Sequence, residues 1–291
     1  MKDIRQTLFH IHHCRGIGLK GTKRLLEKLP NLHSIFDLKP STLRQITRST
    51  PANIELFYKD LHSFPSERYM KLYSENDIEW ITLMDADYPP LLNQVYDPPL
   101  LLFLKGDKSL LVATKKLAVI GSRDATSYTE KVLQTMIPKL VRKDIVIVSG
   151  LAQGADTIAH KETISSGGRT IGVLGSGFNH IYPKQNEYLA HQMMMDHLLL
   201  SEYPPYIKPE KRQFPFRNRI ISGLSEAVLI TEARKKSGTF ITADYALNEG
   251  RGVLCIPGSI HEPLAEGTNS LIQEGATMVL SIEDIYSELR V

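Results

Sequence analysis

The sequence lacks an apolar run of about 18 residues, the length that a helix needs to cross a bilayer. The N-terminus, MKDIRQTLFHIHHC, is amphipathic and interrupted by charge, which argues against a signal peptide. There are only two cysteines, Cys14 and Cys255, and neither has CxxC spacing or clustered histidines around it. The sequence therefore predicts free thiols, no disulfide framework and no metal site, in a cytoplasmic protein without contact to a membrane.

The composition is that of a globular protein, with 42% apolar and 23% charged residues in 291. This length predicts one large and one small domain with a sizeable core. The net charge of +3 is unevenly spread, because residues 1–64 hold eleven Lys and Arg against five Asp and Glu. Such an excess is compatible with a nucleic-acid surface and equally with the solvated face of a helical bundle.

Two regions with different patterns follow each other along the chain. From Ile4 to about Tyr73, apolar residues recur at three- and four-residue spacing between prolines, which predicts a bundle of short helices over residues 1–75. Residues 76–112 contain paired prolines at 89–90 and 98–99, so we expect an extended linker and lead-in to the second domain. Residues 113–291 are predicted to form that domain.

Short apolar runs alternate with helical patterns after Lys115. The runs are KLAVIG, DIVIVSG, TIGVLG, HLLLSEY, AVLITEA, GVLCIPG and TMVL. Runs rich in Val, Ile and Leu and joined by helices are typical of a parallel sheet buried on both faces. The predicted fold class is therefore α/β, a Rossmann-like, doubly wound and mostly parallel sheet preceded by a small all-α domain. In such sheets ligands bind beyond the carboxyl ends of the strands, so the loops after the runs are the candidate sites.

The first two of these loops combine glycine with polar residues. Gly121-Ser122-Arg123 follows KLAVI, where glycine lets an anion approach the backbone and Arg123 adds a cation. A plain structural turn is the alternative. In SGLAQGADTIAH, Ser149 lacks the GxSxG context of a catalytic nucleophile, and Asp156 and His160 are predicted to cap and pack rather than to bind a metal.

Two further loops add cations. Lys184 in HIYPKQN can meet a phosphate, while the nearby aromatic residues Tyr182 and Phe178 can stack on a base or belong to the core. Arg217 and Arg219 begin a helix, where cations oppose the helix dipole, so we expect a bound anion between them. The alternative is a salt bridge from one of the two arginines to Glu202 or Glu232.

The fifth loop, Ser237-Gly238-Thr239, opens a helix directly after RKK and can present N–H groups and hydroxyls to a phosphate. Five loops that carry Arg, Lys, Gly and Ser thus converge on one edge of the sheet. This pattern predicts a site that binds a polyanion and has no obvious catalytic nucleophile.

A sixth motif lies in the N-terminal region. The segment CRGIGLKGTKRLLEK predicts two helices around a Gly-Ile-Gly turn, with Lys20, Lys23 and Arg24 after the turn. Such a helix-hairpin-helix element can contact a DNA backbone without reading its sequence. A module for protein interaction is an equally supported interpretation.

The ordered motifs KLAVIGSR, IVSGLAQGAD, HIYPKQN, SEYPP, FPFRNRIISGLS, EARKKSGTFITA, IPG and GTNSLIQEGA resemble the DprA/Smf family of DNA-processing proteins of bacterial transformation, over about residues 80–280. The resemblance implies a domain that binds single-stranded DNA, forms a homodimer, protects incoming strands and loads the RecA recombinase onto them. It implies no enzymatic activity and no cofactor. The N-terminal region resembles the sterile-alpha-motif-like (SAM-like) domain of many members. Some members also carry a C-terminal winged helix, which this chain is expected to lack. The resemblance assigns DNA contacts to Gly121, Ser122, Arg123, Ser149, Gly150, Gln153, Lys184, Asn186, Arg217, Asn218, Arg219, Ser237, Gly238 and Thr239.

Two other functions are weighed against this interpretation. Nucleotide phosphoribohydrolases have similar glycine-rich loops, but their PGGxGTxxE pattern carries a glutamate where this chain has Thr242, and RKK replaces PGG. A nucleotide-sensing module needs an acidic residue at a second strand end for the ribose hydroxyls, and Glu202 is the candidate for that role.

Overall fold

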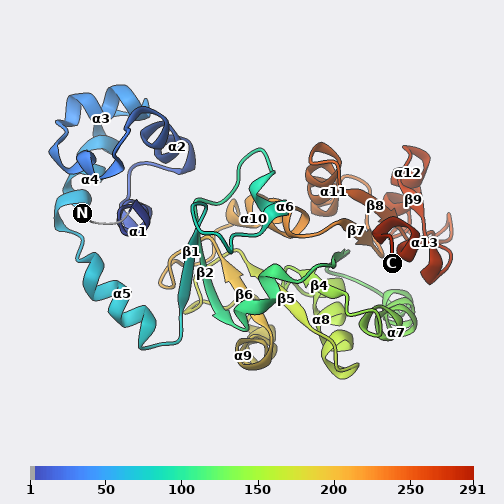
Figure 1. Cartoon of the computed structure of the whole chain (residues 1–291). Helices are drawn as coiled ribbons and strands as arrows, with labels where there is room; N and C mark the ends of the chain where they lie inside the picture. The colour runs from blue at the N-terminus through green and yellow to red at the C-terminus, as the bar shows by residue number, and fades with distance from the viewer. Residues whose placement is uncertain (1–3) are drawn as a thin grey trace. The chain divides into compact units, whose positions relative to one another are not determined.

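The computed structural model describes residues 4–291, which divide into two compact units (Figure 1). The first unit comprises Met1–Ala86 and Pro99–Leu102, and the second comprises Asp87–Pro98 and Phe103–Val291. Over the described residues, no helix combines the length and the apolar character that crossing a membrane requires.

The first unit is mainly helical. Its elements are α1 (Ile4–His13), α2 (Leu19–Lys28), η1 (Leu32–Asp37), α3 (Pro40–Thr47), α4 (Pro51–Ser63), α5 (Ser66–Ser74) and the strand β1 (Glu79–Thr82). Proline occupies the first turns of α3 and α4, where its missing N–H costs no hydrogen bond. Buried apolar side chains from α1 to α4, including Leu8, Leu25 and Phe57, form the core of this unit.

The segment predicted as an extended linker, residues 76–112, contains regular structure, and this part of the sequence-based description is corrected. It holds β1, the short helix α6 (Pro90–Asn93), the strand β2 (Leu101–Gly106) and the 3-10 helix η2 (Lys108–Val112). The prolines at 89–90 do not prevent a helix, because Pro90 lies in the first turn of α6.

The sheet has nine strands in the order β1-β2-β6-β5-β4-β3-β7-β8-β9. The remaining strands are β3 (Lys116–Ile120), β4 (Val146–Ser149), β5 (Thr170–Leu174), β6 (Leu198–Ser201), β7 (Ala227–Ile230), β8 (Gly252–Cys255) and β9 (Thr277–Met278). Along the spatial order β6-β5-β4-β3-β7-β8-β9, all neighbouring strands are parallel. Strand β2 runs antiparallel to β6. Strands β3 to β7 are fully buried, as a parallel sheet covered on both faces requires.

Helices cover both faces of the sheet of the second unit (Figure 1). One face carries α10 (Gln213–Leu224) and α11 (Gly238–Asn248), which pack against each other. The other carries α7 (Ser127–Val141), α8 (Ala155–Ser165), α9 (Glu187–Asp196) and α13 (Ile282–Leu289), while η3 (Lys184–Asn186) precedes α9 and α12 (Glu266–Gln273) follows β8. The predicted Rossmann-like α/β fold with an all-α N-terminal region is confirmed.

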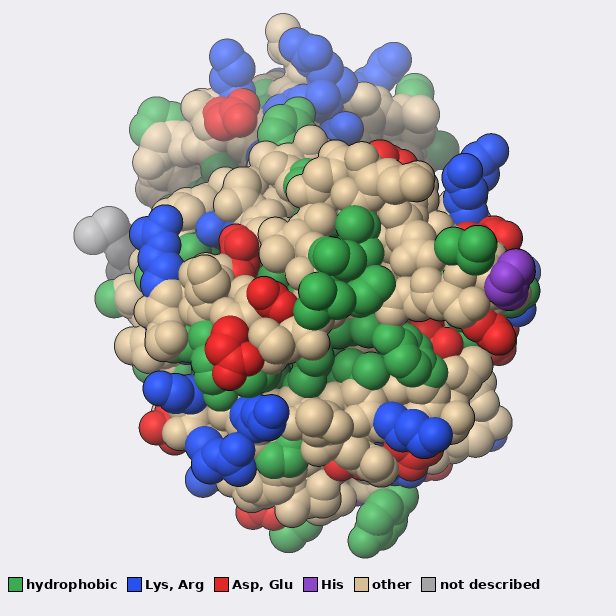
Figure 2. Space-filling model, turned by 90° about the vertical axis from the view of Figure 1, so that its right-hand side faces the viewer, with side chains coloured by type: hydrophobic (Ala, Val, Ile, Leu, Met, Phe, Trp, Pro, Cys, Tyr) green, Lys and Arg blue, Asp and Glu red, His purple; other side chains and the backbone are tan. Residues whose placement is uncertain are grey.

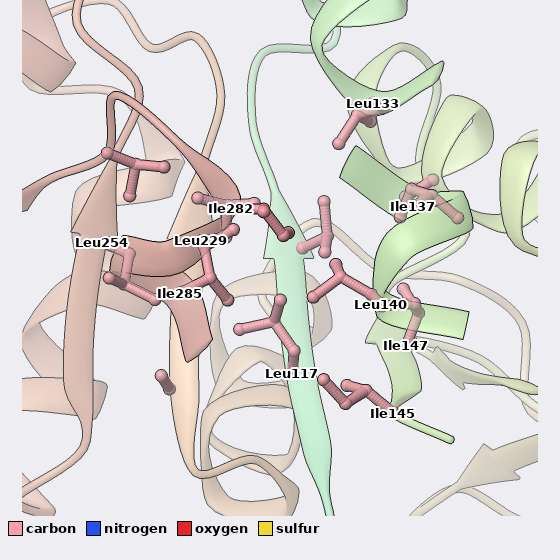
Figure 3. Packing of buried hydrophobic residues seen from close by; sticks show 14 of the residues in the cluster. Leu117, Leu133, Ile137, Leu140, Ile145, Ile147, Leu229, Leu254, Ile282 and Ile285 are labelled. Carbon is pink, nitrogen blue, oxygen red and sulfur yellow. The ribbon is translucent and has the colours of Figure 1, made fainter. Parts of the chain in front are cut away.

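A hydrophobic core of the second unit lies between the central strands and two helices of one face. Leu133, Ile137 and Leu140 of α7 and Ile282 and Ile285 of α13 all belong to it (Figure 3). They pack on side chains of β3, β4, β7 and β8, namely Leu117, Val119, Ile147, Ala227, Leu229 and Leu254. This core fixes the central strands, so the loops at their carboxyl ends start from a rigid frame.

Candidate nucleic-acid interface

A cavity of about 580 Å³ lies at the carboxyl ends of β3 and β7 in the second unit. The chain continues from β3 to β4, β5 and β6 on one side, whereas β7 is followed by β8 and β9 on the other. Loops leave in opposite directions at such a switch point and open a crevice for a ligand. Three segments supply most of the lining: the loop after β3, the first turns of α10, and the stretch from Arg234 into α11.

The structure brings eight of the residues predicted from sequence to this cavity. They are Gly121, Ser122, Arg123, Arg217, Asn218, Ser237, Gly238 and Thr239. The convergence of the β3 loop, α10 and the start of α11 agrees with the sequence prediction of one polar site at the sheet edge. Their assignment to DNA contact stays a prediction.

The Gly121-Ser122-Arg123 loop is fixed by backbone hydrogen bonds on both sides. The N–H of Ser122 donates to the carbonyl of Glu232 at 2.7 Å, and the carbonyl of Ser122 accepts from the N–H of Ala155 at 3.1 Å. A Cβ at Gly121 would lie 2.6 Å from Oγ1 of Thr231, so the close packing of this turn requires glycine.

The buried Glu232 carboxylate fixes the start of α7 beside the cavity. It accepts hydrogen bonds from the N–H of Thr126 at 2.8 Å, from Oγ1 of Thr126 at 2.8 Å and from Oγ1 of Thr129 at 2.7 Å. Glu232 is therefore engaged with hydroxyls and a backbone amide, and it forms no ion pair with Arg217 or Arg219 among the described residues. The loop that carries Arg123 is held between this carboxylate and α8.

Arg123 is one of the exposed cations that line the cavity. Its guanidinium carbon lies 6.0 Å from the centre of the Phe214 ring. The ring of Phe214 lies 5.4 Å from that of Tyr182, and both rings line the cavity. A half-exposed aromatic wall beside an exposed guanidinium offers a stacking surface for a base next to a partner for a phosphate.

Arg217 lies under the cavity, where it is 5% exposed. Its Nη1 donates to the carbonyl oxygens of Gly150 and Val173, so it ties the ends of β4 and β5 to α10. Burial lowers the pKa of Arg217 to about 10, which still leaves the guanidinium charged at neutral pH. A Cβ at Gly150 would lie 2.5 Å from Nη2 of Arg217, which explains the glycine after β4. The guanidinium of Arg217 thus places a positive charge beneath the cavity.

Asp156 faces the same buried guanidinium from α8. Its carboxylate accepts from the N–H of Gly150 at 3.1 Å and from the N–H of Ala152 at 3.2 Å, so it caps the turn after β4. Burial raises the pKa of Asp156, and the positive charge of Arg217 opposes that shift. The capping role predicted for this residue is confirmed, and no group of His, Cys, Asp and Glu suited to a metal ion occurs over residues 4–291.

Arg219 is not part of the cavity, and its predicted contact with an anionic ligand is corrected. Its Nη2 donates to both carboxylate oxygens of Glu202 at 2.7 Å, and its guanidinium carbon lies 4.0 Å from the centre of the Phe216 ring. The side chains of Arg219 and Glu202 are 3% and 8% exposed. Residues two apart on a helix point in nearly opposite directions, so Arg217 and Arg219 serve different neighbours. The alternative salt bridge to Glu202 is the one that the structure contains.

The start of α11 provides a second anchor for an anion. Gly238 begins this eleven-residue helix, and no atom lies within 4 Å of the position that a Cβ would take there. The Oγ of Ser237 is buried and has no hydrogen-bond partner among residues 4–291. Because the first N–H groups of a helix are unpaired and carry a partial positive charge, a phosphate in the cavity can bind at this end of α11.

Three of the predicted residues hold the loops together instead of lining the cavity. Ser149 is fully buried, and its Oγ donates to the carbonyl of Val119 at 2.6 Å. Gly150 packs on Arg217, as described above. Asn186 is buried, and its Nδ2 donates to the carbonyl of Leu151 at 2.9 Å and to Oγ1 of Thr157 at 2.8 Å. These residues position the site indirectly.

Gln153 and Lys184 are exposed and lie outside the cavity lining. Lys184 begins η3, two residues after Tyr182, which does line the cavity. Contact of Gln153 and Lys184 with DNA stays a prediction.

The sequence analysis did not predict that Phe214 and Lys211 line the cavity. It treated Arg234 only as positive charge that precedes the Ser237-Gly238-Thr239 loop. Phe214 precedes Arg217 by three residues on α10, and this spacing places both on one face of the helix. That spacing is a signal that the segment FPFRNR contains. The cavity is lined by four cations, Arg123, Lys211, Arg217 and Arg234, against two carboxylates, Asp124 and Asp156. It therefore carries a net positive charge.

The model of one protein family matches residues 79–290 of this chain, and its description is "DNA recombination-mediator protein A". A curated DNA processing protein DprA from Bacillus subtilis is 46% identical over 253 residues, which cover 87% of this chain and 84% of the relative. The corresponding protein from Streptococcus pneumoniae is 46% identical over 207 residues, covering 71% of this chain and 73% of the relative.

Two solved structures are similar at the level of the fold. The crystal structure of DprA from Streptococcus pneumoniae has a TM-score of 0.85 and 36% identity, and the match covers 98% of both chains. A DNA processing protein A from Helicobacter pylori, whose structure was solved to examine its single-stranded DNA binding mode, has a TM-score of 0.66 and 31% identity. That match covers 73% of this chain and 96% of the Helicobacter chain.

Proposed function

Because this chain belongs to the DNA recombination-mediator protein A (DprA/Smf) family, we propose that it binds single-stranded DNA without regard to sequence during natural transformation. In this role it protects incoming strands and loads the RecA recombinase onto them. It acts as a cytoplasmic homodimer without enzymatic activity or cofactor. The site of this binding is the cavity at the ends of β3 and β7.

The observation that carries the proposal is the combination of charges, helix start and aromatic wall in one crevice. Arg123 and the first turn of α11 supply partners for phosphates, and Phe214 and Tyr182 supply rings on which bases stack. Duplex DNA binds this cavity more weakly, because paired and stacked bases do not reach the rings. None of these contacts depends on which base is present, so the binding is independent of sequence.

The two alternative functions receive less support from the same residues. A phosphoribohydrolase needs a carboxylate at the position of Thr242, and the buried Asp156 is engaged by two backbone amides. A nucleotide-sensing module needs Glu202 for ribose hydroxyls, but both oxygens of that carboxylate accept from Arg219. We therefore favour a polymeric ligand over a nucleotide.

Fluorescence anisotropy with labelled oligo-dT over a salt series tests the proposal. Arg123→Ala is expected to weaken binding and to reduce the slope of log K against log salt by about 0.7, the value for one lost phosphate contact of a single strand. Arg212→Ala is the matched control, since Arg212 is 85% exposed, pairs with Glu210 and lies outside the cavity. If Arg123→Ala and wild type bind oligo-dT equally, the cavity is not the binding site for single-stranded DNA.

A second variant separates stacking from charge. Phe214→Ala is expected to lower the affinity for oligo-dT by about 1–3 kcal/mol, because it removes a ring on which a base stacks. The salt slope stays that of wild type, since no charge is lost. The exposed Tyr96, which lies outside the cavity, gives the control Tyr96→Ala. Tight binding of mononucleotides in calorimetry, together with unchanged oligo-dT binding by Phe214→Ala, would instead favour the nucleotide-sensing module.

Delivery of the strand to RecA is tested by ATP hydrolysis of RecA on single strands coated with a single-strand-binding protein. The wild-type chain is expected to shorten the lag before hydrolysis. Arg123→Ala shortens it less than Arg212→Ala, because delivery requires the strand to be held. A lag that the wild-type chain leaves unchanged would restrict the function to binding and protection.

A further inference from the structure

The charges of the first unit are segregated along its chain. Residues 4–48 hold nine Lys and Arg against two Asp and Glu, whereas residues 49–86 hold three against seven. The acidic half forms α4, α5 and the lead-in to the second unit, and the basic half includes α2 and α3. One side of this small unit is therefore strongly positive, although the whole chain has a net charge of only +3.

Helices α2 and α3 bring the basic residues together. Nη1 of Arg24 donates to the carbonyl of Thr47 at 2.7 Å, which joins the middle of α2 to the last residue of α3. Lys20 and Lys28 lie four residues before and after Arg24, so the three share one ridge of α2. Arg44 and Arg48 lie three residues before and one residue after Thr47. The ridge of α2 and the end of α3 thus form one basic face.

The outer cations of this face are exposed and have no carboxylate partner among the described residues. Lys20, Lys28, Arg44 and Arg48 are all exposed, and none of them forms an ion pair. The other arginines of the basic half differ, because Arg5 pairs with Asp85 at 2.7 Å and Arg15 pairs with Asp60 at 2.8 Å. The uncompensated charge is therefore concentrated on α2 and α3. In the space-filling view, Lys and Arg side chains gather at the top, over the end of the unit that carries these helices (Figure 2).

The basic face offers charge and little else to a partner. The large apolar residues of the first unit that are exposed, Ile4, Leu72 and Met84, lie outside α2 and α3. There is thus no aromatic platform for unpaired bases, unlike the wall of Phe214 and Tyr182 in the second unit. From Lys20 to Lys28 the ridge spans about 12 Å, roughly the axial rise of three to four nucleotides of one strand in a duplex.

We propose that the α2–α3 face of the first unit is a second DNA-binding surface, which takes the phosphate backbone of duplex DNA. The phosphates of a duplex are presented outward on a regular backbone, so cations on a rigid ridge meet several of them at once without touching a base. The surface is separate from the single-strand cavity and does not depend on its function. An acidic protein is the competing partner for the same charge.

The test uses the full chain and a variant with three exposed cations of the face neutralised, Lys20→Gln with Lys28→Gln and Arg44→Gln. Arg24 is left in place because it holds α2 to α3. The matched control neutralises three exposed cations of α4 and α5 in the same unit, Lys59→Gln with Arg68→Gln and Lys71→Gln, and so has the same net charge. Binding of a blunt duplex and of a short oligo-dT is measured by anisotropy over a salt series, and circular dichroism verifies folding.

The face variant is expected to bind duplex at least about tenfold more weakly than the control at low salt, with a salt slope reduced by up to about 2.7, or 0.9 for each phosphate released. Its binding of short oligo-dT stays that of wild type, while Arg123→Ala gives the converse result. If the control variant loses as much duplex affinity as the face variant, the loss comes from the lower net charge of the chain and not from the α2–α3 face. That result would overturn the proposal. Wild-type duplex binding by the face variant would also overturn it and leave an acidic protein as the partner of this surface.

Discussion

At the scale of single residues, two arginines two positions apart on α10 have different partners and different structural roles. Arg217 ties the ends of β4 and β5 to α10 beneath the cavity, and Arg219 forms a buried pair with Glu202 and packs on Phe216. The cost of removing both charges of such a pair from water is offset only while both partners are present. Nε and Nη1 of Arg219 already have no hydrogen-bond partner, so Glu202 is the sole counter-charge that the described residues place on this guanidinium.

Glu202→Gln is therefore expected to lower the free energy of unfolding of the second unit by about 3–5 kcal/mol, because it leaves the charge of Arg219 buried without a counter-charge among the described residues. The exposed pair of Arg212 and Glu210 provides the comparison, with side chains 85% and 53% exposed. Glu210→Gln is expected to change stability by less than about 1 kcal/mol. Urea unfolding followed by circular dichroism measures both variants. Similar stabilities for the two would mean that water reaches Arg219 and that the pair contributes little.

At the scale of elements, the sequence predicts the sheet better than the loops. Runs such as KLAVI and AVLI are apolar without alternation because β3 and β7 are buried on both faces. Short apolar runs of this kind that are joined by helices are typical of a parallel sheet. The prolines Pro40 and Pro51 each stand at the first turn of a helix, so these helix starts can also be predicted from the sequence. The prolines around α6 were misinterpreted, because a proline that begins a helix and a proline that excludes one look alike in sequence.

For the candidate site, too, only part of the structure could be predicted from the sequence. The loops that meet at the cavity could be predicted, since parallel strands end at one edge of the sheet. Which side chain points into the cavity could not, because Ser149 and Asn186 are polar residues of those loops that bond inward to backbone carbonyls. The position of Arg219 depends on Glu202, a neighbour seventeen residues away that the local sequence does not identify.

The packing of α8 on β5 predicts a dependence of stability on pH. Nδ1 of His160 lies 2.7 Å from Oγ1 of Thr170, and Nε2 is buried without a hydrogen-bond partner in the part of the chain that the structure describes. Burial lowers the pKa of His160 to about 3 from its ordinary value of 6.5. Between these pH values the unfolded chain binds one proton more than the folded chain, so this histidine makes stability fall as the pH decreases below about 6.5. The loss ends near the folded pKa.

His160→Gln is expected to reduce the loss of stability between about pH 7.5 and 5.5 by about 1.4 kcal/mol, the linkage of one proton over that interval. Glutamine keeps a polar group near Thr170 and does not titrate. The exposed His191 of α9 gives the control, His191→Gln, which retains the dependence of wild type. Urea unfolding at each pH supplies the measurement. The same slope in His160→Gln and wild type would show that protonation of His160 is not linked to unfolding.

At the scale of the whole molecule, each unit has a hydrophobic core of its own. One buried cluster of the first unit consists of residues between Leu8 and Leu61, and one of the second unit consists of residues between Leu117 and Leu289. Units with separate cores can unfold in separate steps, so a single free energy of unfolding does not describe the chain. The single-strand cavity lies wholly in the second unit, and the basic face of α2 and α3 lies wholly in the first. A ligand of one site therefore acts on one step only.

Scanning calorimetry is accordingly expected to resolve two transitions that respond to different DNA. Short oligo-dT at about 100 times its Kd adds about 2.7 kcal/mol to the second unit and raises its Tm by about 5–10 °C, while the Tm of the first unit stays fixed. Blunt duplex shifts the transition of the first unit instead. Arg123→Ala removes the first shift and retains the second, and the face variant does the reverse. A single transition that moves as one with either ligand would mean that the two units unfold together, and their sites would then be coupled through the folded state.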